Sequence, residues 1–120
     1  MVSPARSNLA SAIRTTTQTV SVTNSGARGI RVVLDTTLNA AGSLVVTIDY
    51  FDPASGKYIN LLTGAAVITA VTNVYSIHPD LIAVANVTVA NVTPIGTIRI
   101  LVTAGNANAV TYSLGVAFLP

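Results

Sequence analysis

The sequence predicts an all-β fold: a single-domain antiparallel β-sandwich or jelly roll of about seven to eight strands with an N-terminal arm. Apolar and polar residues alternate with a period of two in several stretches, most regularly in residues 42–64. Clusters of Gly, Asn and Pro separate these stretches, as turns do in sandwiches. No stretch has the periodicity of a long helix, and 120 residues suit one domain. We divide the chain into the arm, residues 1–13, and a β-sandwich domain, residues 14–120.

The arm has weak periodicity and is rich in small polar residues. We expect it to be extended, with one helical turn over residues 7–13 as an option, and to be removable without loss of the fold. Arg6, and Arg14 just beyond the arm, are the candidate partner-binding residues, because such an arm can lie across a neighbouring subunit.

The first half of the domain contains four expected strands. Residues 14–23 are dominated by Thr and Val, which favour strands. A turn at residues 24–26 leads to the second strand, residues 27–37. Residues 42–64 then predict a hairpin, whose turn is supplied by Asp, Pro and Gly at residues 52–56.

The second half is less regular. Residues 65–77 carry Val, Ile and Thr on both faces, which predicts a strand covered on both sides. Pro79 interrupts the pattern, and residues 81–85 are expected to form a short helical turn. Strands are predicted at residues 96–103 and 110–119. The pattern leaves jelly-roll and immunoglobulin-like topologies open.

Charged residues are unusually scarce. Six Lys or Arg and four Asp make up 8% of the chain, against about 25% in an average protein. The surface of the folded domain, roughly 6,100 Å² from its mass, must therefore consist mostly of small polar and apolar side chains. Because a soluble monomer avoids large apolar patches, we expect other subunits to cover much of it, in a homo-oligomer.

The same composition argues against several kinds of partner. The net charge is only +2 and the Arg residues are scattered, so no nucleic acid is expected. Residues 58–77 and 81–98 are uncharged, but Asn, Thr and Gly interrupt them and their β-branched residues favour strands, so no membrane is expected either.

No residue pattern indicates an enzyme or a cofactor. Ser76, His78 and Asp80 share one short segment, which is more typical of a turn than of a catalytic triad. One His and no Cys make a zinc site hard to build. Asp49 and Asp52 are three residues apart and should point to opposite faces of a strand, so no metal site is predicted.

Several short phrases resemble a group of small β-rich virion structural proteins of tailed bacteriophages. The phrases cover most of the chain from Arg14 onward: Arg14-Thr15-Thr16-Thr17, residues 27–35, residues 52–58, residues 78–81 and residues 110–115. The resemblance implies a capsid decoration (cement) protein, located on the virion, that binds the major capsid protein or another virion protein and forms an oligomer, with a trimer favoured. It brings no catalytic residues.

An alternative is a carbohydrate-binding or adhesin-type β-sandwich module on a phage fibre or tail or on a cell surface. Tyr50 and Tyr58 flank the predicted hairpin and would form its sugar-stacking platform. Packing of aromatic residues across the strands is the simpler explanation of the same pattern.

Overall fold

The computed structural model describes residues 6–90 and 92–120, and within them the chain forms nine strands and no helix, which confirms the all-β prediction. The strands are β1 (Arg6–Arg14), β2 (Gln18–Asn24), β3 (Gly29–Asn39), β4 (Leu44–Asp52), β5 (Lys57–Thr63), β6 (Thr72–Ile77), β7 (Thr88–Val89), β8 (Gly96–Ala104) and β9 (Val110–Leu119). Nothing in this part of the chain is a helix able to cross a membrane.

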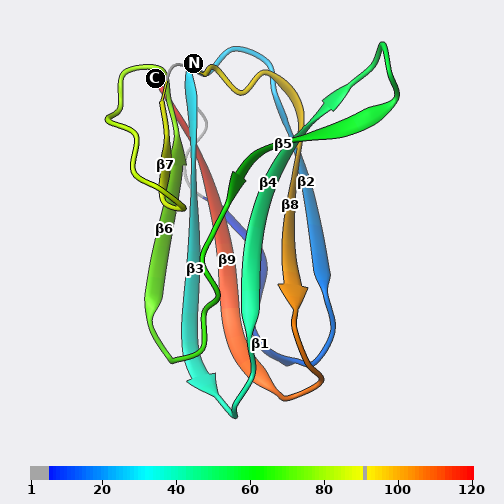
Figure 1. The fold of residues 1–120 in the computed structure, drawn as a ribbon, viewed down its shortest axis with the longest axis vertical. Coiled ribbons are helices and arrows are strands. Elements are labelled where there is room, and N and C mark those ends of the chain that lie inside the picture. The colour runs from blue at the N-terminus through cyan, green and yellow to red at the C-terminus, as the bar shows by residue number, and fades with distance from the viewer. Residues whose placement is uncertain (1–5, 91) are drawn as a thin grey trace.

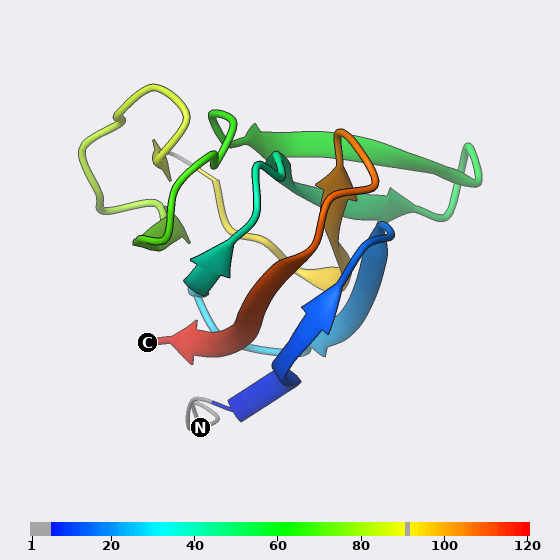
Figure 2. The same ribbon diagram turned by 90° about the horizontal axis from the view of Figure 1, so that it is seen from below.

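The strands form two sheets that pack face to face (Figures 1 and 2). One sheet has the order β1-β9-β3-β6-β7, and the other has the order β2-β8-β4-β5. All pairs are antiparallel except β6 with the two-residue β7. The accessible surface, 6150 Å², agrees with the area expected from the mass.

The strand order is that of a jelly roll. β1 pairs with β9, β2 with β8, β3 with β6 and β4 with β5, so the pairs are nested as in one long hairpin. Additional pairs of β9 with β3 and of β8 with β4 roll this hairpin into two layers. Two layers built by such a nested path define the jelly roll, which resolves the alternative that the sequence left open.

The core follows from the period-two pattern. Alternate residues of the central strands β3, β4, β8 and β9 point between the sheets, where apolar side chains exclude water. The largest fully buried side chains are Tyr112, Ile30, Leu34, Ile48, Ile77, Ile98, Ile100 and Leu114.

The arm is where the structure departs most from expectation. Residues 6–13 have no helical turn; they form strand β1, which pairs with β9 from Arg6–Val116 to Arg14–Val110. Leu9 packs against the core. The predicted boundary therefore falls at the last residue of a strand that completes the five-stranded sheet, while residues 1–5 lie outside the described part.

Two further local predictions are wrong. Only Thr72–Ile77 of residues 65–77 forms strand β6; the preceding residues cross between the sheets, with Val67 bridged to Leu44. The expected helical turn at residues 81–85 is an exposed loop, which ends where Asn86 adopts a φ of 62°. The predicted coverage of residues 65–77 on both faces is not provided by other parts of this chain, because Ile68 is 66% exposed.

We expect removal of residues 1–13 to lower the free energy of unfolding by at least about 2 kcal/mol, because Leu9 leaves the core and β9 loses a neighbour. Chemical denaturation measures the loss. Leu9→Ala should reproduce part of it, whereas Ser11→Ala, at an exposed position of the same strand, should not. If the truncated chain were as stable as the full chain, residues 1–13 would be an independent arm, as the sequence predicted.

Candidate functional site

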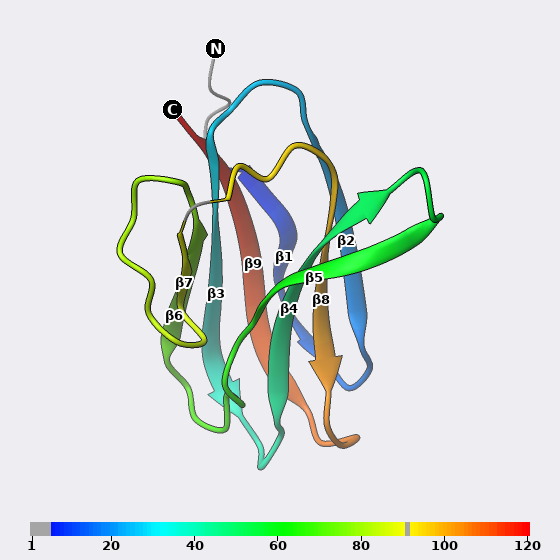
Figure 3. The same ribbon diagram turned by 45° about the horizontal axis from the view of Figure 1, so that its top comes forward.

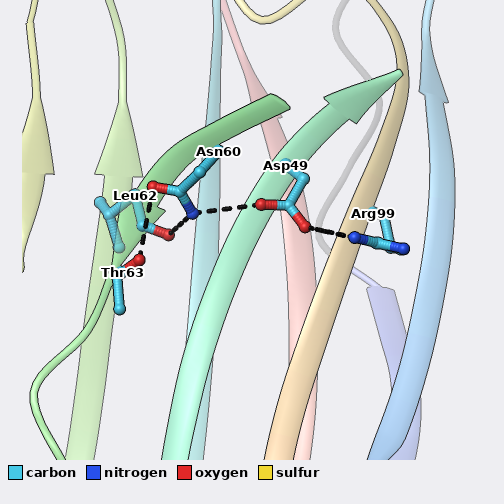
Figure 4. Close-up of polar contacts among 5 residues, drawn as sticks. All are labelled: Asp49, Asn60, Leu62, Thr63 and Arg99. Carbon is cyan, nitrogen blue, oxygen red and sulfur yellow. Dashed lines mark hydrogen bonds and ion pairs between the residues drawn. The ribbon is translucent and has the colours of Figure 1, made fainter. Parts of the chain in front are cut away.

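A polar network crosses the outer face of the four-stranded sheet (Figure 4). Asp49 of β4 lies between Arg99 of β8 and Asn60 of β5, its partners in the strand register. Arg99 donates to Asp49 Oδ2 from Nη2 at 2.8 Å and from Nε at 3.3 Å. Asn60 Nδ2 donates to Asp49 Oδ1 at 3.1 Å. Both carboxylate oxygens are thus engaged, and Asp49 is only 4% exposed.

A β-bulge explains the position of Asn60. Ile48 pairs with Leu62 and Asp49 with Asn60, which leaves Leu61 as the extra residue. The bulge disrupts the ladder locally, and Asn60 Nδ2 also donates to the Leu62 carbonyl at 3.2 Å. Leu61 packs against the core beside the buried Leu62. The network therefore stabilises an irregular point in the sheet.

Aromatic rings cover the same network. The Arg99 guanidinium lies 3.8 Å from the centroid of the Tyr58 ring, which favours the cation electrostatically. Tyr58 in turn packs on Phe51, with ring centroids 5.3 Å apart and an angle of 59°. Together these contacts fix the β4–β5 hairpin where it projects from the sandwich (Figure 3). The arrangement holds a surface element in place and leaves Asp49 only 4% exposed.

The turn of this hairpin follows the prediction. Asp52 accepts hydrogen bonds from the Ser55 hydroxyl at 2.7 Å and from the Ala54 and Ser55 amides. The bond from the Ser55 hydroxyl is the main reason that the pKa of the Asp52 carboxyl is lowered. Gly56 takes a φ of 72°, as the turn requires. The tip is exposed and acts as a turn former, because Asp52 is turned toward its own backbone.

Of the two predicted partner-binding residues, Arg14 is directed at its own chain. Its guanidinium donates to the carbonyls of Tyr112 and Ala10 and lies 4.7 Å from the Tyr112 ring centroid. Arg14 therefore ties β1 to β9. Arg6 is at the opposite end of β1, paired with Val116, and its side chain lies outside the described residues. The structure does not bring the two together.

The segment around His78 does not form a triad. His78 Nδ1 accepts from the Asp80 amide at 3.0 Å, which leaves the proton on Nε2, 2.8 Å from the Pro120 carbonyl. The Asp80 carboxylate pairs instead with Arg28 at 2.9 Å, at an exposed position. Among the residues that the structure describes, no group of three His or Asp side chains could hold a metal ion.

Tyr50 and Tyr58 lie on opposite faces of the hairpin. Tyr50 pairs with Ile59 and packs toward the core, whereas Tyr58 pairs with Phe51 on the outer face. Tyr50 lines a hollow of about 320 Å³ with Leu61 and residues 92–95. The two rings therefore do not make one sugar-stacking platform.

No protein-family model and no curated protein matches the chain. The function must be inferred from the surface and from the chemistry described above.

We expect Arg99→Met to cost about 3 kcal/mol of unfolding free energy, because it leaves the Asp49 carboxylate buried and unpaired. Adding Asp49→Leu should recover most of this loss. Arg28→Met, which breaks the exposed pair with Asp80, should cost no more than about 1 kcal/mol. Equal effects of the two Arg substitutions in denaturation experiments would contradict a stabilising role of the network.

The buried side chains of Tyr75 and Tyr112 should make the protein less stable at alkaline pH. Burial raises the pKa of Tyr75 and of Tyr112 above 10.0, and nearby Arg14 offsets part of the rise for Tyr112. The folded state favours the neutral phenol. Its contribution to the free energy of unfolding is therefore complete below pH 10 and is lost as pH rises through the pKa of the folded state. Unfolding followed from pH 8 to 12 should show this loss, and Tyr75→Phe with Tyr112→Phe should reduce it. An unchanged slope in that double variant would contradict the assignment.

Proposed function

We propose that the chain is a structural protein of a virus particle, a capsid decoration protein that stabilises the head through protein–protein contacts with the major capsid protein. The observation that carries this proposal is that the described residues between 64 and 98 expose many apolar side chains and nearly no charge. The resemblance to virion proteins of tailed bacteriophages supports it independently, and so does the low charge of the whole chain.

These residues belong to β6, to the two-residue β7 and to the loops beside them, which Figure 1 shows together at one side of the sandwich. Ile68 and Ile82 are 66% and 86% exposed. Further exposed apolar side chains in this region are Val71, Val74, Val84, Val87 and Ile95. Asp80 is the only charged residue in the segment, and Arg28 neutralises it. Depletion of charge with apolar exposure is the composition of an interface core rather than of a solvated surface.

The shape of this surface also fits a protein partner. Residues 65–69, Val71, Asn73–Tyr75 and residues 85–87 line an open hollow of about 250 Å³. A hollow of this size accepts one or two apolar side chains of a partner. A stable contact buries about 800 Å² on each side, so the decoration protein would act through buried area and needs no catalytic group.

The jelly roll is compatible with this role and does not establish it. The architecture occurs in viral capsid proteins and in lectins, and fold alone does not determine function. The carbohydrate-binding alternative loses its specific support, because Arg99 covers one face of Tyr58, and Asp49 and Asn60 bond to each other. A glycan array tests that alternative directly.

We expect the chain to occupy regular positions on the assembled particle encoded with it, visible by electron cryomicroscopy. Ile68→Asp and Val87→Asp should each weaken co-sedimentation with undecorated particles at least tenfold, because a carboxylate would be buried in the contact. Thr103→Asp, on the outer face of the other sheet, is the matched control and should bind normally. Particles that lack the chain, or equal binding by all three variants, would refute the proposal.

A further inference from the structure

The outer face of the five-stranded sheet has a symmetric arrangement of charge. On its central part, β3 presents Arg31, Val33 and Asp35 outward, since the residues between them are buried. Arg31 and Asp35 are four residues apart, about 13 Å along a strand. They are therefore too distant to pair with each other, and Val33 lies midway between them.

Neither charge has a counter-ion within the described part of the chain. Asp35 Oδ1 accepts a hydrogen bond from the Thr72 hydroxyl at 2.9 Å, and Arg31 is exposed. This contrasts with Arg28, Asp80, Asp49 and Arg99, all of which form ion pairs. On a face with so few charges, an unpaired charge of each sign at equal distances from a central residue suggests a partner with the reverse arrangement.

The neighbours of Val33 on the adjacent strands are uncharged. Gly115 of β9 and Val74 of β6 pair with Val33 in the register, and the residues of β9 on this face are Thr111, Ser113, Gly115 and Ala117, of which Ala117 is buried. Small side chains of this kind let a second sheet approach closely.

We propose that a second copy of this chain packs on this face. The two-fold axis lies between the facing five-stranded sheets of the two copies, runs perpendicular to the strands and passes over Val33 of each β3. This rotation places Arg31 of each copy opposite Asp35 of the other and makes two identical ion pairs. Val33, Gly115 and Val74 each meet their own counterpart at the axis.

The same rotation joins the two ends of the face. Thr111 lies four residues before Gly115 and Leu119 four residues after it, so Leu119 of one copy faces Thr111 of the other. Thr111 belongs to an open hollow of about 270 Å³, lined also by Ile13, Leu38 and Ala40. Ile13 and Leu38 are 71% and 68% exposed in the single chain. Leu119 would cover them.

A two-fold contact differs from the trimer that the resemblance implies, because a face that packs on itself requires a two-fold axis. The inference rests on the charge arrangement and does not depend on the proposed function. Val74 also borders the hollow assigned to the virion partner, so the two contacts would share this residue.

The test uses charge reversal in the full chain. Light scattering coupled to gel filtration should give twice the chain mass for the wild type at micromolar concentration. Arg31→Asp and Asp35→Arg should each give the single-chain mass, with at least a tenfold weaker association, because like charges then face each other. An equimolar mixture of the two variants should recover the doubled mass, since each then supplies the charge that the other needs.

The control is Lys57→Asp at the tip of the hairpin, which changes the net charge by as much as Arg31→Asp does but lies away from this face. This variant should remain a dimer. Because the chain has no cysteine, Val33→Cys supplies a second measurement. A short bismaleimide should link two copies through this position, and should not link copies of Thr103→Cys. Circular dichroism confirms that each variant is folded. A monomeric wild type, a dimer that neither reversal weakens, or a mixture that stays monomeric would overturn the proposal.

Discussion

The fold depends on β9, which lies between β1 and β3 in the five-stranded sheet. This last strand pairs with β3 from Gly29–Leu119 to Asn39–Val110, and on its other edge with β1. Its inward residues Tyr112 and Leu114 are fully buried. The five-stranded sheet cannot form before β1, β3 and β9 are all in place. Most contacts therefore join residues that are distant in sequence. Such a topology folds slowly, because long loops must be ordered before these contacts form.

Several of the few charged residues have a definite structural task. Arg99 and Asp49 hold the bulged β5 against β4, Arg28 pairs with Asp80 across the loop after β6, and Arg14 ties β1 to β9. On a surface rich in formal charge, single pairs contribute little because alternative partners and salt compete with them. Here the neutral surroundings offer few alternative partners, so the pairs specify which elements meet.

The sequence predicted those parts of the fold that have local causes. The β4–β5 hairpin and strands β3, β8 and β9 follow from period-two alternation and turn residues. β1 was missed because irregularities between Ser7 and Leu9 and between Leu9 and Ala12 break its alternation. Residues 65–71 look like a strand, yet their backbone contacts with strands are the bridge of Val67 to Leu44 and the hydrogen bond from the Thr36 amide to the Val71 carbonyl. The contact of Asp49 with Arg99 joins residues 50 positions apart, and only the strand order reveals it.

The edges of the sheets indicate how the molecule would assemble. Strand addition needs a long regular edge, and three of the four edges in the described sheets are not regular. β1 contains irregularities, β5 has a bulge at Leu61 and begins with Lys57, and β7 is two residues long and bridged to Val84. β2 is the exception. The faces and side loops, by contrast, carry few charges and expose apolar residues. In a chain with blunted edges, any assembly would use the faces and not the edges, and this would limit open-ended growth of a continuous sheet.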